Sequence, residues 1–254
     1  MVKTILSIAL WVITAAALIV LFVFAREDYL TRPVQQIQLI THADTGFVRK
    51  AEVREALWKL CGQKNIGTVN MVNIQKHLDA NPWIASNASY IDLDGTLTVS
   101  YEEYTPKFRV FGNDGRSVYV TDDGVVVPTS RLYTPYVMVA SGNFHIDNDT
   151  TAYPLTDSIE SHRNLINALA WLKAIDGNSF INSSVGQLYC NAHNEFELTV
   201  KDIDARVIVG DTCLAADKLH RLEIFMKQRP VGTEGTNMKS INLNYKNQIV
   251  CTKR

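Results

Sequence analysis

The sequence has no excess of charge of either sign: 25 lysines and arginines stand against 26 aspartates and glutamates, for a formal net charge of −1. Without a basic surface, the chain lacks the electrostatic footprint of a nucleic-acid-binding protein. Cysteine is scarce as well. The four cysteines are too few for a disulfide-built fold, so either one or two bridges form or all four are small buried hydrophobes. They are Cys61, Cys190, Cys213 and Cys251.

Motifs of known catalytic and metal sites are also missing. No His-Glu-x-x-His, Gly-x-Ser-x-Gly, phosphate loop or Ser-x-x-Lys occurs. Cys190-x-x-His193 has no second ligand pair, and Asp147-Asn148-Asp149 lacks the glycine and the distal glutamate of a calcium loop. Asp122-Asp123-Gly124 is better explained as a turn than as paired carboxylates. We therefore predict no catalytic site, no metal site and no cofactor. A membrane-anchored enzyme with a site that forms only in space remains the alternative, which a pocket of converging titratable groups would favour.

Only one hydrophobic run is long, the 22 uncharged residues Thr4–Ala25. As a helix it would measure about 33 Å, enough to cross a hydrocarbon core of about 30 Å. It predicts a transmembrane helix over residues 4–25 after a cytoplasmic stub of residues 1–3. Lys3 precedes the run and the charges after it nearly cancel, which places the N-terminus in the cytoplasm and the bulk of the chain outside. The alternative is a signal peptide cleaved after Val23-Phe24-Ala25, although such peptides have apolar regions of only roughly 7–15 residues.

Residues 34–104 are predicted to form a small α+β domain of order β-α-α-β-β. Apolar residues from Val53 to Leu60 recur at helical spacing, Asn70 is a helix cap, and Asp94-Gly95 between alternating runs is a strong hairpin signal. Trp83 follows the helix-ending Asn81-Pro82 and is expected to be partly buried against Leu57 or Leu78. The strands are expected at Gln36–Ile40, Ile84–Leu93 and Thr96–Glu103, and the helices end near Gly62 and Asn81.

Residues 105–254 are predicted to form a mixed, mainly β domain with two helices. Short apolar runs alternate there with Gly, Asp and Pro turns. In one strand, Phe196, Leu198 and Val200 should face the core and Glu197 should face solvent. The helices are expected at about Ser158–Ile175 and Ala215–Gln228. The strands are expected at Phe108–Phe111, Ser117–Thr121, Val125–Val127, Tyr136–Ala140, Val185–Asn191, Glu195–Lys201, Ala205–Val209, Ile241–Tyr245 and Gln248–Cys251.

Several short motifs follow one another along the whole chain. They are Ala51-Glu52-Val53, Val69-Asn70, Leu78-x-x-Asn81-Pro82-Trp83-Ile84, Gly95–Val99, Glu103-Tyr104-Thr105-Pro106, Val120–Val126, Val207–Gly210 with Lys218-Leu219, and Ile241–Tyr245. In this order, and after one N-terminal span, they resemble the FtsQ/DivIB family of bacterial cell-division proteins. Tyr104 and Asn244 stand where the family has arginine, and Tyr133–Asp157 has no counterpart. The resemblance implies a POTRA domain over residues 34–104 and a β domain over residues 105–254.

The resemblance also implies a function. Such proteins are non-enzymatic scaffolds of the divisome, anchored in the inner (plasma) membrane with the bulk of the chain in the periplasm, and active in septum formation. The implied partners are small bitopic coiled-coil proteins of the FtsB and FtsL kind, with no small-molecule substrate. The alternative is a POTRA-containing component of protein transport or outer-membrane assembly, which would need repeated POTRA units or a C-terminal barrel.

The end of the chain supplies the predicted binding surface. A last strand over Asn247–Cys251 would be followed by only Thr252-Lys253-Arg254, so no segment would cover it, and an open strand edge accepts another strand. If this strand were central in its sheet, that interface would not exist. The predicted partner-binding residues are Tyr245, Lys246, Asn247, Gln248, Ile249 and Val250, with Tyr245 and Ile249 as side-chain anchors.

Overall fold

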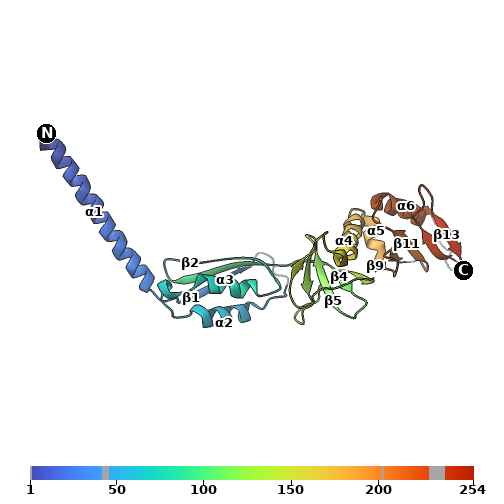
Figure 1. Cartoon of the computed structure of the whole chain (residues 1–254), viewed down its shortest axis with the longest axis horizontal. Coiled ribbons are helices and arrows are strands. Elements are labelled where there is room, and N and C mark those ends of the chain that lie inside the picture. Colours follow the sequence, from blue (N-terminus) through green and yellow to red (C-terminus); the bar gives the residue numbers. More distant parts are fainter. Residues whose placement is uncertain (1, 42–45, 202, 229–237) are drawn as a thin grey trace. The chain divides into compact units, whose positions relative to one another are not determined.

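The protein is described here by a computed structural model that covers residues 2–41, 46–201, 203–228 and 238–254 (Figure 1). The chain divides into two compact units, Met1–Glu103 and Tyr104–Arg254. The architecture is α+β, as the sequence predicts: an apolar N-terminal helix, a small mixed sheet with helices, and a larger mixed sheet with helices.

The N-terminal helix α1 (Val2–Thr31) is longer than the apolar run that predicts it. It continues beyond Ala25 through Arg26, Glu27 and Asp28, because Arg and Glu form helices well and neither Gly nor Pro follows until Pro33. Asp28 accepts a hydrogen bond of 2.5 Å from the Arg32 guanidinium one turn later. Within α1, the segment Ser7–Thr31 is long and apolar enough to cross a membrane.

The first unit contains the predicted β-α-α-β-β order. Its sheet has the strand order β1-β3-β2, with β1 parallel and β2 antiparallel to β3. Asn70 caps α3 by accepting a hydrogen bond from the Asn73 backbone N–H at 3.2 Å, and Gly95 closes the β2–β3 hairpin with φ of +85°. The elements are β1 (Gln36–Thr41), α2 (Lys50–Cys61), the 3-10 helix η1 (Ile66–Thr68), α3 (Met71–Asp79), β2 (Ile84–Ile91) and β3 (Thr96–Glu103).

The core of this unit forms between its sheet and the helices α2 and α3 (Figure 1). Leu97, Val99 and Tyr101 alternate along β3 and are buried together with Leu57 of α2 and Leu78 of α3. Trp83 is buried, as predicted, and its ring stacks on Phe47 with 4.1 Å between the ring centroids and 2° between the planes. Phe47 is the aromatic partner that the sequence analysis did not name.

The second unit is built on a ten-stranded sheet of order β13-β12-β11-β10-β9-β7-β4-β5-β6-β8. Most neighbours are antiparallel, but β7 runs parallel to both β4 and β9, and β12 runs parallel to β11. The elements are β4 (Pro106–Phe111), β5 (Ser117–Thr121), β6 (Val125–Pro128), β7 (Met138–Gly142), β8 (Tyr153–Pro154), η2 (Glu160–His162), α4 (Arg163–Asp176), α5 (Ser179–Ser184), β9 (Val185–Cys190), β10 (Phe196–Val200), β11 (Arg206–Gly210), α6 (Ala215–Gln228), β12 (Met238–Asn242) and β13 (Val250–Lys253).

The helices of this unit differ from the prediction in two places. The expected helix Ser158–Ile175 begins as the 3-10 turn η2 and becomes α-helical only at Arg163, and a further short helix, α5, follows it. Asn178 caps α5 by accepting a hydrogen bond from the Ile181 N–H at 3.1 Å, so a second helix starts directly after Gly177. Helix α6 has the predicted bounds.

One contiguous core joins the sheet to these helices. Trp171, Leu165 and Ile175 of α4 are fully buried against it, and Phe196, Leu198 and Val200 of β10 face inward as predicted. Glu197 alternates with them and therefore faces the other side of the sheet, as predicted, but only 9 % of that residue is exposed to solvent. Its carboxylate accepts a hydrogen bond from Asn191 and lies 3.9 Å from the Arg206 guanidinium. These two contacts reduce the free-energy cost of burying the charged group.

The segment between β7 and α4 overlaps the stretch Tyr133–Asp157, which has no counterpart in the resemblance, and is fixed by a buried histidine. His162 is 2 % exposed; its Nδ1 accepts the Thr156 backbone N–H at 3.0 Å and its Nε2 lies 2.8 Å from Asp147. Nε2 therefore donates the hydrogen bond. Burial by itself would raise the pKa of Asp147, but the hydrogen bonds from His162 and Ser161 outweigh it, so this pKa lies below its ordinary value.

Asp147→Asn should destabilise the second unit by about 1 kcal/mol at neutral pH, discounted for the partial exposure of this carboxylate. A carboxylate with a lowered folded-state pKa stabilises the fold above its unfolded pKa of about 3.9, and this stabilisation disappears as the pH falls through the folded value. The unfolding free energy of the variant should therefore fall less steeply below about pH 4 than that of the native chain. Parallel pH profiles in denaturant titrations would contradict this assignment.

Candidate partner-binding edge

Strand β13 forms one end of the ten-stranded sheet and pairs on one side with β12. All four of its residues are exposed. Successive residues of a strand direct their N–H and C=O groups to opposite sides, so about half of these groups point away from β12. The other end of the sheet is β8, which has two residues, one of them proline without an N–H. In the described part of the chain, β13 is therefore the better template for an added strand.

The position of this edge differs from the prediction. The last strand was expected at Gln248–Cys251, but β13 covers Val250–Lys253. The preceding strand, β12, ends at Asn242, although Leu243 still donates its N–H to Ile208 at 2.9 Å. Asn247 has φ of +59°, a left-handed conformation that interrupts an extended strand. This turn moves the start of β13 toward the C-terminus.

Most of the predicted partner-binding residues lie in the connection between β12 and β13. Tyr245 is half exposed, Ile249 packs partly against the core, and Val250 is the first residue of β13. Lys246, Asn247 and Gln248 form the exposed turn between them. The structure thus places these six residues next to the edge, with only Val250 in the edge strand itself.

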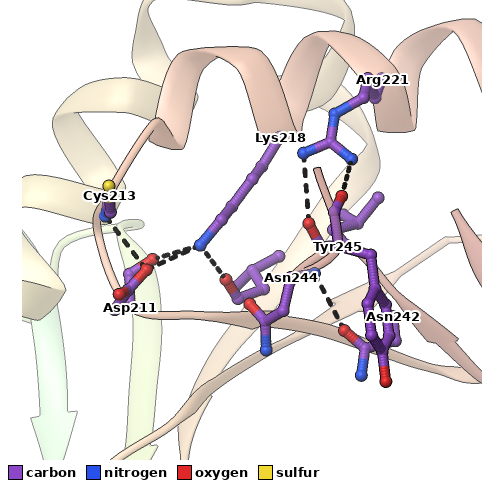
Figure 2. A network of polar contacts seen from close by, with 9 residues as sticks. Asp211, Cys213, Lys218, Arg221, Asn242, Asn244 and Tyr245 are labelled. Carbon is purple, nitrogen blue, oxygen red and sulfur yellow. Dashed lines mark hydrogen bonds and ion pairs between the residues drawn. The ribbon is translucent and has the colours of Figure 1, made fainter. Parts of the chain in front are cut away.

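Arg221 of α6 holds this connection (Figure 2). Its Nη1 donates to the carbonyl oxygens of Tyr245 at 2.8 Å and Gln248 at 2.9 Å, and its Nη2 donates to Leu243 at 3.2 Å. Its Nε donates to Asp217, one helical turn earlier, at 3.0 Å. Because the guanidinium is planar and always charged, it fixes three carbonyls of one loop in a defined geometry.

Lys218, three residues earlier on α6, holds the turn after β11 (Figure 2). Its side chain is buried, and its ammonium donates to the carbonyls of Val209 and Asp211, each at 2.9 Å, and to the Asp211 carboxylate at 2.8 Å. All three donors are thus used. The hydrogen bond from Lys218 is the main cause that lowers the pKa of Asp211, which burial opposes.

The hydrogen bonds of Lys218 and of Arg221 to backbone carbonyls form two clamps. A cavity of about 680 Å³ opens between them. Its walls carry titratable side chains, among them His193, Glu195 and Asp217. However, the Lys218 ammonium and the Arg221 guanidinium that line it already donate to protein oxygens. With both cations engaged in this way, the cavity has the character of a polar surface groove. It does not favour the enzyme alternative.

The residues considered for metal binding do not come together. In the described ranges, no group of three or more His, Cys, Asp or Glu side chains is placed to hold a metal ion. Cys190 is buried, and desolvation raises the pKa of its thiol to about 11, so the thiol is protonated at neutral pH and a poor nucleophile. Cys61 is also buried, while Cys213 and Cys251 are exposed, so the interpretation as four buried hydrophobes holds for two.

Sequence reasoning missed the two clamps. Lys218 and Arg221 lie among the apolar positions Leu219 and Leu222 on the core side of α6, where a cation is unusual. Asp217 and Arg221 at i, i+4 spacing could have been noticed, but that spacing is typical of a surface ion pair and not of a carbonyl clamp.

Comparison with known proteins identifies a relationship for most of the second unit. A family model described as FtsQ/DivIB, C-terminal related, matches residues 105–252, which is more than half of the chain. A search of curated protein sequences gives no match.

Proposed function

This chain belongs to the FtsQ/DivIB, C-terminal related family, whose members are cell-division proteins and generally not enzymes, and from that premise we propose that it is a non-enzymatic, membrane-anchored scaffold of the divisome. Helix α1 would be the anchor in the inner membrane, and the two units would act outside the cytoplasm at the division septum. The partners would be bitopic coiled-coil proteins of the FtsB and FtsL kind.

The observation that carries the proposal is the exposed strand β13 at the end of the large sheet. A partner segment would add to this edge as a further strand, so that backbone hydrogen bonds supply affinity and neighbouring side chains supply selectivity. Tyr245, beside the edge, and Val250, in the edge strand, are both exposed and would be side-chain contacts. Ile249 would act indirectly, because it packs partly against the core and positions the start of β13.

Proline substitution in β13 tests strand addition. Thr252 and Lys253 are consecutive, so the N–H of one points toward β12 and the N–H of the other points away from it. One of the two variants Thr252→Pro and Lys253→Pro therefore removes an outward N–H and leaves the pairing with β12 intact. With this one intermolecular bond lost at about 1 kcal/mol, that variant should bind the FtsB/FtsL-like partner about 5-fold more weakly. The measurement is titration with the partner alongside circular dichroism.

Thr252→Val is the matched control, because it keeps the backbone donor and the branched shape and should bind normally. Full-strength binding by both folded proline variants would exclude this edge. The partner surface would then have to be sought on the first unit.

The anchor and its orientation are tested by a reporter that is active only outside the cytoplasm. Fused after Arg254, it should be active, and the mature protein should retain the apolar run Thr4–Ala25. A soluble mature form that begins at Arg26 would show that the run is a cleaved signal peptide.

A further inference from the structure

The end of α1 is joined to the tip of the β2–β3 hairpin. The Tyr29 hydroxyl donates to the Ile91 carbonyl at 3.1 Å, and the Arg32 guanidinium donates to the Leu93 carbonyl at 3.0 Å. Just after the helix, the Gln35 N–H donates to the Gly95 carbonyl at 3.1 Å. The hairpin tip is therefore tied to residues that lie within ten positions of the last apolar residue of the run, Ala25.

A second segment, between α2 and α3, is tied to the same few residues. The Val34 N–H donates to the Lys64 carbonyl and the Ile66 N–H donates to the Arg32 carbonyl, each at 2.9 Å. Two glycines allow this close approach. A Cβ on Gly67 would lie 3.2 Å from the Leu30 Cβ, and a Cβ on Gly95 would lie 2.7 Å from the Pro33 carbonyl oxygen. These contacts hold one end of the first unit against the end of α1.

The helical rise sets how far this end lies from the hydrocarbon. From Ala25 to Tyr29 the helix advances about 6 Å, and from Ala25 to Arg32 about 10 Å. The headgroup layer on each side of a bilayer is roughly 5–7 Å thick. A helix that spans the membrane therefore places the hairpin tip in or directly above the headgroups.

Apolar side chains are exposed at this end. Leu93, in the hairpin turn, is 77 % exposed, and Tyr90, near the end of β2, is 53 % exposed. Val72, in the first turn of α3, is 60 % exposed. Ile40 is near the other end of β1 and is only 36 % exposed. A turn with an exposed leucine at its tip gains free energy by contact with a lipid surface.

We infer that the β2–β3 hairpin tip, with Leu93 at its centre, inserts into the phospholipid headgroup layer of the membrane that α1 spans, and so holds the first unit at a fixed height. This inference rests on the anchor role of α1 in the proposed function. Asp92 and Asp94 flank Leu93 and are fixed by hydrogen bonds to Thr98 and Thr96. The contact is therefore apolar and does not require anionic lipid, since these carboxylates would be repelled by it.

The inference is tested on the full chain in vesicles of phosphatidylcholine brominated at acyl carbons near the headgroup, with unbrominated vesicles as reference. Trp11→Leu and Trp58→Phe provide a background in which the remaining tryptophans, Trp83 and Trp171, are buried. Leu93→Trp is the probe, and Ile40→Trp is the matched control at the opposite end of the unit. The probe should be quenched by the brominated lipid and should emit at shorter wavelength, while the control should match the background.

Each other outcome overturns the inference. A chain that floats with the vesicles and binds its partner, but whose Leu93→Trp emission is not quenched, contradicts only the lipid contact. Equal quenching of both probes would show that the unit has no fixed orientation. No quenching in lipid alone, with the probe shielded only when the partner is added, would identify a protein contact instead. A chain that fails to float would refute the anchor of the proposed function as well.

Discussion

Trp83→Ala is expected to lower the unfolding free energy of the first unit by roughly 3–5 kcal/mol, the range of large aromatic truncations in cores. Trp83 is 7 % exposed and stacks on Phe47, which is itself 2 % exposed. The Phe47 N–H donates to the buried Glu103 carboxylate at 3.0 Å, so the stack also positions the end of β3. Removing the indole would leave a cavity and loosen this polar contact.

The measurement is hydrogen exchange of the full chain under increasing denaturant, which reports the two units separately. Trp58→Ala is the matched control, because Trp58 lies in the same unit but is 40 % exposed, and it should cost less than about 1 kcal/mol. Trp83→Phe should recover part of the stability by restoring the stack. Equal losses for Trp83→Ala and Trp58→Ala would contradict the assignment of Trp83 to the core.

Arg221→Met is expected to reduce partner binding on the order of 100-fold while the rest of the second unit stays folded. It keeps the apolar stem but removes hydrogen bonds to three carbonyls of the β12–β13 connection. At about 1 kcal/mol net for each bond, the native conformation of the loop loses roughly 3 kcal/mol of stability. A partner would have to supply this free energy to order the loop on binding, so its affinity falls.

Hydrogen exchange over residues 243–253 and titration with the partner give the two readouts. Lys227→Met is the matched control: the same kind of change on the same helix removes an ion pair with Glu223 and a contact with the Phe180 ring, both away from the β12–β13 connection, and should alter neither readout. Arg221→Lys keeps the charge without the planar fork and should fall between the native chain and Arg221→Met. Faster hydrogen exchange in the loop with unchanged affinity for the partner would show that the loop is not part of the interface, and would contradict the prediction.

The sequence by itself determined the elements whose signals are local. Helical spacing and caps predicted α2, α3 and α6, with Asn70 as an observed cap. Asp94-Gly95 predicted the β2–β3 hairpin because only a few neighbouring residues decide such a turn. The apolar run predicted the N-terminal helix, and ordered motifs predicted the family. The helix, turn and apolar-run signals involve residues close together in the chain, and the motif signal needs only their order along it, so each can be read without the fold.

Tertiary structure alone decided the features that depend on distant partners. The parallel insertion of β7 between β4 and β9 joins segments far apart in sequence. The burial of Glu197 and Lys218 depends on hydrogen-bond partners in other elements, and so does the choice of Phe47 to stack on Trp83. The start of β13 was predicted two residues too early for the same reason. The alternation of apolar residues continues in the sequence, but Asn247 adopts a left-handed conformation. Hydrogen bonds from Arg221 to the Tyr245 and Gln248 carbonyls, before and after Asn247, hold this turn.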